Sequence, residues 1–258
     1  MKTALKIILG IIVAIALGIG SVFYFTADMV DATDGFFTSV KNNDLDKAYS
    51  WLSEDFKAST SPDDLKDFVD VNGLGNYKEA SWSSRSIEGG KGEISGTITT
   101  DSGNTVPLTV GFVKGGDGWK IYSIRKPAAG LQSDSTAVEV PEEDEAVRLI
   151  RKSINHFAES VNQKSMQMFH SQISNLWQQQ FSVADLDQAY KAFYDANIDL
   201  TVLNDMSPQF NFNPELDQNG VLLIKGRYPT QPSQFHFEQK FIYEGLSWKL
   251  VGFSANIE

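Results

Sequence analysis

Residues 112–121, Phe-Val-Lys-Gly-Gly-Asp-Gly-Trp-Lys-Ile, return as residues 241–250, Phe-Ile-Tyr-Glu-Gly-Leu-Ser-Trp-Lys-Leu, 129 positions later. Each stretch places an aromatic residue before a Gly-containing turn and a Trp-Lys pair after it. Earlier in the chain, the pattern Ser-x-x-Asp-Leu occurs at 61–65 and again at 182–186, 121 positions later. The C-terminal half therefore repeats the N-terminal half, with about eight extra residues in the middle of the second copy.

Within each copy the hydrophobic period changes from helical to extended. In the first copy apolar residues recur at steps of three and four and later alternate with polar ones, which predicts helices followed by antiparallel strands. Asp44 and Ser61 stand where helix caps are expected. Pro107 cannot donate to a β-ladder, so we expect its strand to be at an edge or bulged there. The predicted strands of the second copy lie at 198–204, 209–213, 220–227, 234–243 and 247–254.

These patterns predict an α+β fold. Each copy is expected to have about three N-terminal helices packed on a curved antiparallel sheet of four or more strands, and one transmembrane helix is expected before the first copy. The predicted organisation is a cytoplasmic N-terminus at 1–6, a transmembrane helix at 7–25, a first domain at 28–126, a linker at 127–143 and a second domain at 144–258.

Composition restricts the function. Of the 258 residues, 41% are apolar and 12% aromatic, which is enough for two packed cores. The formal net charge is −11, and a surface that acidic disfavours nucleic-acid binding. The chain has no cysteine, which excludes disulfides, thiolate metal sites and thiol nucleophiles. We expect no metal site and no cofactor.

Residues 7–25 form a run of nineteen residues without a charge. As a helix this run is about 28 Å long, close to the roughly 30 Å hydrocarbon core of a bilayer. Lys2 and Lys6 precede it and Asp28 follows it, so the positive-inside rule places the N-terminus in the cytoplasm. The sequence predicts a single-pass protein of a bacterial inner membrane, with both domains in the periplasm or outside the cell.

The alternative is a cleaved signal peptide. Its apolar region is usually shorter, and Phe23-Tyr-Phe25 stands where small residues are needed before cleavage. Gly18-Ile-Gly20 still offers a possible cleavage site. Both alternatives export the two copies from the cytoplasm.

A resemblance to a known superfamily rests on three repeated features. These are the helix ends at 36–42 and 157–163, the Ser-x-x-Asp-Leu caps and the two Trp-Lys strands. The arrangement resembles the cone-shaped, cystatin-like α+β domains of the nuclear transport factor 2 (NTF2) superfamily, seen twice in tandem. It is similar in particular to bacterial secreted or membrane-anchored members of unknown function. The resemblance covers about residues 28–126 and 144–257 and implies a fold rather than an activity.

Enzymes of this superfamily place an Asp and a Tyr or His inside the cone to move a proton next to a carbonyl. His236 and Glu238 share one side of a predicted strand and could form a polar pair if that side lined the cone; the other reading is a charged solvent face. Trp177, Tyr190 and Tyr194 could line a ligand pocket in the second copy, or they could be packed core aromatics.

The sequence carries no zincin, nucleophile-elbow, phosphate-loop or EF-hand motif. It therefore favours a non-catalytic role outside the cytoplasm, binding an envelope protein or an apolar small molecule, or scaffolding. The alternative is an isomerase-like or cyclase-like pocket enzyme that acts through the second domain.

Overall fold

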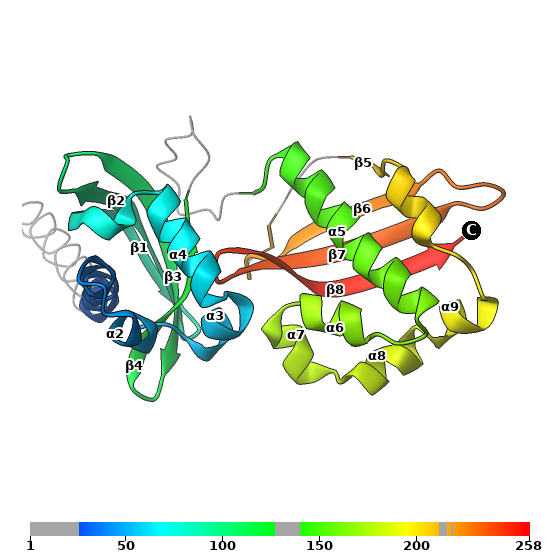
Figure 1. Ribbon diagram of the computed structural model, residues 1–258, viewed down its shortest axis with the longest axis horizontal. Coiled ribbons are helices and arrows are strands. Elements are labelled where there is room, and N and C mark those ends of the chain that lie inside the picture. The colour runs from blue at the N-terminus through cyan, green and yellow to red at the C-terminus, as the bar shows by residue number, and fades with distance from the viewer. Residues whose placement is uncertain (1–25, 127–139, 212–215, 218) are drawn as a thin grey trace, which may run out of the picture. The chain divides into compact units, whose positions relative to one another are not determined.

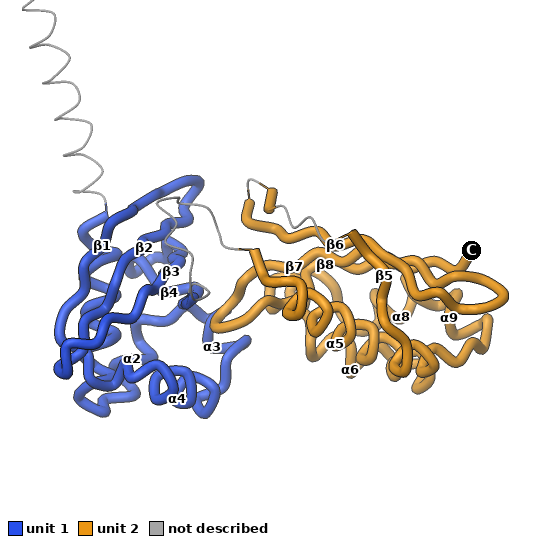
Figure 2. The backbone as a smooth tube through the Cα atoms, turned by 90° about the horizontal axis from the view of Figure 1, so that it is seen from above, with its two compact units in different colours: residues 1–136 blue, residues 137–258 orange. Residues whose placement is uncertain are grey.

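The computed structural model describes residues 26–126, 140–211, 216–217 and 219–258. The chain divides into two compact units, Met1–Thr136 and Ala137–Glu258 (Figure 2). Among the described helices, none has the length and apolarity that a membrane span requires. The predicted span at 7–25 and most of the predicted linker lie outside the described residues.

The first unit places helices before a four-stranded sheet (Figure 1). A helix over residues 26–41 opens it. The other elements are α2 (Leu45–Ser50), α3 (Glu54–Ser59), α4 (Pro62–Val71), η1 (Leu74–Asn76), β1 (Tyr77–Glu88), β2 (Lys91–Thr100), β3 (Thr105–Gly115) and β4 (Gly118–Arg125). All strand pairs are antiparallel, in the order β1-β2-β3-β4.

The second unit has the same sheet order, β5-β6-β7-β8, again antiparallel. Its helices are α5 (Glu143–Asn162), α6 (Gln167–Gln172), α7 (Asn175–Gln180), α8 (Val183–Ala189), α9 (Lys191–Ala196) and η2 (Thr201–Asp205). Its strands are β5 (Gln209–Phe210), β6 (Leu222–Tyr228), β7 (Phe235–Glu244) and β8 (Ser247–Ile257). The α+β class and the antiparallel sheets predicted from the sequence are confirmed.

Equivalent positions of the two units begin and end helices in the same way. Ser61 and Ser182 each form a capping box, with Asp64 and with Asp185 respectively. The Ser53 hydroxyl accepts a hydrogen bond from the Phe56 amide at 3.1 Å. At the equivalent position 121 residues later, the Ser174 hydroxyl accepts one from the Trp177 amide, also at 3.1 Å. The long first helix of each unit is followed by a left-handed residue, Asn43 with φ 55° and Lys164 with φ 51°.

The last hairpin of each sheet carries the same irregularity. Phe112 pairs with Ile121, but Gly111 pairs with Ser123, so Tyr122 is an extra residue on β4. In the second unit Phe241 pairs with Leu250, but Lys240 pairs with Gly252, so Val251 is the extra residue on β8. The two bulges are 129 positions apart, the same offset as in the sequence repeat. The repeat is therefore also present in the pairing register of the strands.

Pro107 lies on β3, a central strand, where it pairs with Thr97 of β2. On its other side β4 ends at Arg125, which pairs with Thr109. Pro107 therefore lies two residues beyond the last described pair of β3 and β4, and no described strand there needs its missing amide. The prediction that this strand is at an edge or bulged at Pro107 is wrong, because β3 is central and its register with β2 is continuous through Pro107.

The helices are shorter and more numerous than predicted. Ile173, with ψ 172°, separates α6 from α7, so the second unit has more than the three helices expected. The strand predicted at 198–204 is wrong, because residues 201–205 form the 3-10 helix η2. The Asp199 carboxylate accepts hydrogen bonds from the Thr201 amide at 2.9 Å and from the Thr201 hydroxyl at 2.6 Å. These bonds close a turn in place of an extended strand.

The core of the second unit lies between α5 and one side of its sheet. Phe157 of α5 is fully buried, and its ring lies 5.0 Å from that of Tyr190 and 4.7 Å from that of Phe253. The Ser153 hydroxyl on the same helix donates to the amide oxygen of Gln239 on β7 at 2.9 Å. Gln239 therefore marks the inner face of the sheet, and the opposite face, which we call the outer face, is the one that positions the site.

Candidate functional site

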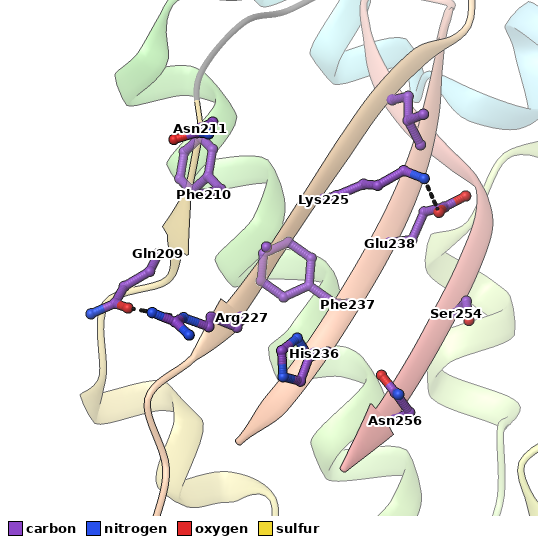
Figure 3. A pocket seen from close by; sticks show the side chains of 12 residues that line it. Gln209, Phe210, Asn211, Lys225, Arg227, His236, Phe237, Glu238, Ser254 and Asn256 are labelled. Atoms are coloured by element: carbon purple, nitrogen blue, oxygen red, sulfur yellow. Dashed lines mark hydrogen bonds and ion pairs between the residues drawn. The ribbon is translucent and has the colours of Figure 1, made fainter. Parts of the chain in front are cut away.

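A broad concavity of about 970 Å³ lies on the outer face of the second unit's sheet (Figure 3). All four strands contribute lining residues. The lining residues are Gln209, Phe210, Asn211, Leu223, Lys225, Gly226, Arg227, His236, Phe237, Glu238, Ser254 and Asn256. Most are polar, and the charged and polar ones of β6 and β7 alternate along their strands with inner-face residues such as Gly226 and Phe237.

The strand register arranges these side chains in two rows that cross the sheet. In the first row Gln209 pairs with Arg227, Arg227 with His236, and His236 with Asn256. In the second, Lys225 pairs with Glu238 and Glu238 with Ser254. Cross-strand neighbours on one face lie about 5 Å apart, so each row brings functional groups from different strands within reach of one ligand.

Gly226 explains how the short edge strand β5 reaches this position. A Cβ atom at Gly226 would lie 2.6 Å from the Gln209 carbonyl oxygen and 2.6 Å from the Phe237 ring. Only a residue without a side chain permits this approach. The glycine thus allows β5 to place Gln209 beside Arg227.

Neutral groups hold the Arg227 guanidinium. Its Nε donates to the Gln209 amide oxygen at 3.2 Å, and its Nη1 donates to the Gln234 amide oxygen at 2.9 Å. Figure 3 shows Arg227 lying between Gln209 and His236. Among the described residues, no carboxylate pairs with Arg227.

The second row contains a satisfied ion pair. Lys225 Nζ lies 2.7 Å from Glu238 Oε2, and Lys240 Nζ lies 3.8 Å from Glu238 Oε1. The hydrogen bond from Lys225 is the main reason that the pKa of Glu238 is below its usual value. Glu238 is therefore an ionised acceptor held by two lysines, which does not suit it to act as a general acid.

A second carboxylate lies at the β8 end of the first row. The Asn256 amide nitrogen donates to Glu258 Oε1 at 2.5 Å. The outer face thus holds cations that include Lys225, Arg227 and Lys240, together with the carboxylates of Glu238 and Glu258, each of which has its own partner.

The equivalent face of the first unit carries different chemistry. Its register places Ser81 opposite Thr97 and Thr97 opposite Pro107, at the positions of Gln209, Arg227 and His236. In the next row a hydroxyl pair replaces the Lys225–Glu238 ion pair, because Ser95 and Thr109 hydrogen-bond to each other at 2.9 Å.

The aromatic residues suggested for a pocket pack together in the core. Trp177 and Tyr190 are buried, and the Tyr190 hydroxyl donates to the Phe253 carbonyl oxygen at 2.8 Å. The Tyr194 hydroxyl donates to Asp187 Oδ1 at 2.7 Å. Burial raises the pKa of both tyrosines, so both remain protonated donors at physiological pH. None of the three lines the concavity of Figure 3.

His236 and Glu238 do lie on the same face of β7, as their alternation predicts, and both line the concavity. This face points away from α5, so the two side chains do not lie in the helix-covered interior. Sequence reasoning missed Gln209, Arg227 and Asn256. The polar positions Lys225 and Arg227, alternating with buried Ile224 and Tyr228, were the available signal for the outer face of β6.

The described residues contain no group of three or more His, Cys, Asp or Glu side chains able to hold a metal ion. What the outer face offers is a fixed guanidinium, an imidazole and several amides. These groups are hydrogen-bond donors suited to recognising a ligand.

No family model matches the chain, and no curated protein matches it. A cystatin-like protein from Ruminococcus gnavus ATCC 29149 has a TM-score of 0.31 and 11% identity, covering 92% of each chain. An NTF2-like protein involved in plasmid conjugation has a TM-score of 0.23 and 12% identity, covering 81% of this chain and 94% of the other. At these scores neither likeness carries an argument about this protein.

Proposed function

We propose that the chain is a membrane-anchored, non-catalytic binding protein with two tandem NTF2-like domains outside the cytoplasm, and that it binds a protein partner of the bacterial envelope through the outer face of β5–β8. Residues 7–25 serve as the anchor, with the N-terminus in the cytoplasm. The apolar run and the preceding lysines, Lys2 and Lys6, support this orientation.

One observation carries the binding role. The two units share caps, a bulge and a strand order, yet the first unit has Thr97 and Pro107 at the positions of Arg227 and His236, and a Ser95–Thr109 pair at the position of the Lys225–Glu238 pair. The charges on the first unit's outer face, Arg125 and Glu93, pair with each other instead. The scaffold alone does not require the charges of the second unit's rows, since the first unit forms the same sheet without charges at those positions. Polar groups that converge on a concave surface fix the orientation of a bound partner and provide specificity.

Fusion reporters test the location. Alkaline phosphatase fused after Glu258 is expected to be active, because this enzyme folds only outside the cytoplasm, whereas β-galactosidase at the same position is expected to be inactive. The opposite pattern would refute the proposed orientation. A fusion released into the medium or periplasm would instead indicate a cleaved signal peptide.

Capture of the partner tests the face. Full-length protein solubilised in mild detergent is used to isolate bound proteins from its native membrane. The double variant Lys225→Gln/Arg227→Gln is expected to lose the partner. The matched control Ser95→Ala/Thr97→Ala alters the equivalent positions of the first unit and is expected to retain it. Equal capture by both variants would contradict binding through β5–β8.

A further inference from the structure

Arg227 differs from the other cations of the outer face. Lys225 and Lys240 both contact Glu238, at 2.7 Å and 3.8 Å. Arg227 is held by the amide oxygens of Gln209 and Gln234, which fix the guanidinium without neutralising its charge. Among the described residues no carboxylate contacts Arg227.

Arg125 of the first unit is a structural arginine with which Arg227 can be compared. Arg125 also lies on the outer face of its sheet, but Glu93 holds it at 2.5 Å, and both side chains are largely covered. Its charge is therefore already compensated. Arg227 is exposed, and two amides orient it with Nη2 and the second Nη1 hydrogen left for a ligand. A fixed guanidinium fork is the side chain best matched to a carboxylate, which it binds through two parallel hydrogen bonds.

The dimensions of the first row indicate the form of the ligand. Gln209, Arg227, His236 and Asn256 come from four adjacent strands. Three strand spacings of about 4.8 Å give a row of about 14 Å, the length of roughly four residues of extended peptide. The amides at its two ends can both donate and accept, as a peptide backbone requires. A single small anion would leave most of this row unused.

Glu258 is the competing charge. Its carboxylate accepts from Asn256 at the β8 end of the row, so an acidic ligand that uses this amide must displace or approach it. Removing the Glu258 charge should therefore strengthen binding, whereas removing the Arg227 charge should weaken it. Opposite effects from two residues of one face are not expected from general changes in stability.

We infer that the row Gln209–Arg227–His236–Asn256 is a binding site for an extended acidic peptide segment, with Arg227 receiving an Asp or Glu carboxylate. This inference rests on the proposed function, because it names the chemistry by which the outer face recognises its partner. The charge complementarity lies between the unmatched guanidinium and the peptide carboxylate.

The test uses the full-length protein in non-ionic detergent and a fluorescein-labelled hexaglutamate peptide, with binding followed by fluorescence anisotropy at low salt and at about 0.15 M salt. Arg227→Gln is expected to weaken binding about tenfold or more, and Arg227→Lys several-fold, since lysine keeps the charge but loses the fork. Glu258→Gln is expected to strengthen binding several-fold. The matched control is Lys191→Gln, which removes one charge from α9, where Lys191 pairs with Asp195, and should change binding less than twofold.

Three results would overturn the inference. The first is that a labelled hexaglutamine peptide binds as tightly as hexaglutamate. The second is that Arg227→Gln and Lys191→Gln lose the same affinity. The third is that inorganic phosphate displaces the peptide at concentrations where free glutamate has no effect. Circular dichroism of each variant confirms that the fold is kept. If hexaglutamate fails to bind but partner capture still requires Lys225 and Arg227, the acidic-peptide inference is wrong and the proposed function stands.

Discussion

Removal of Arg125 should strongly destabilise the first unit. Its Nη2 lies 2.5 Å from Glu93 Oε2, and the two side chains are 10% and 19% exposed. Burial keeps the pKa of Glu93 above its usual value, although Arg125 acts to lower it. Removing one partner of a buried pair costs about 3–5 kcal/mol, and the residual exposure here favours the lower end. For a unit of about 100 residues, about 3 kcal/mol lowers Tm by roughly 12 °C or more.

The effect of Arg125→Met should depend on pH. Because the folded pKa of Glu93 is raised, the native state binds more protons than the unfolded state between the usual value of 4.5 and the raised one. The contribution of Glu93 to the unfolding free energy is therefore most favourable below this interval and declines as pH rises through it. Without Arg125 the pKa rises further and the interval widens, so the loss caused by the substitution should be largest near neutral pH and smaller near pH 5.

Urea unfolding, followed by tryptophan fluorescence at the two pH values, measures this loss. The double variant Glu93→Gln/Arg125→Met should be more stable at neutral pH than Arg125→Met, because it leaves no buried charge without a partner. A loss that is the same at both pH values, or a double variant no more stable than Arg125→Met, would refute the claim that the Glu93 charge causes the effect.

Other substitutions test the packing and the repeat. Ser61→Ala and Ser182→Ala should each lower the unfolding free energy by about 1 kcal/mol, since each removes a capping box, and denaturant unfolding should show similar losses. Gly96→Ala should cost about 1–3 kcal/mol, because the new Cβ would lie 2.8 Å from the Trp82 Cα, and a wild-type Tm would contradict that contact. Phe157→Ala should cost about 3–5 kcal/mol and reduce the near-ultraviolet circular dichroism of the aromatic cluster, and retention of that signal would contradict the described core.

Local signals in the sequence were enough to predict the helix caps. Asp44, Ser61 and Ser182 cap the helices that follow them, because each needs only its own side chain and an amide three residues later. The failure at 198–204 has the same local origin. Ile198, Leu200 and Val202 alternate like a strand, but Asp199 binds the Thr201 amide, and the buried pair Leu200 and Leu203 follows a three-residue step.

The site was harder to predict, because its rows depend on strand register. Alternation correctly placed His236 and Glu238 on one face of β7. Pairing of Arg227 with His236 depends on the connection over residues 229–234, which contains two prolines and fits none of the short hairpin turns with known register. Nothing near His236 in the sequence indicates Arg227, so its role follows only from the sheet.

The repeat itself separates residues that both backbones need from residues that differ between the units. Caps, left-handed residues and the β-bulge recur at fixed offsets because the backbone needs them in both units. Most side chains of the outer faces do not fill a core and are under no such requirement; the buried Arg125–Glu93 pair of the first unit is an exception. Thr97 and Arg227 occupy the same position of the same fold, and one is a small hydroxyl whereas the other is a cation held by two amides. This difference, which packing does not explain, is the basis of the proposal that the second unit carries the recognition chemistry on a scaffold that both units share.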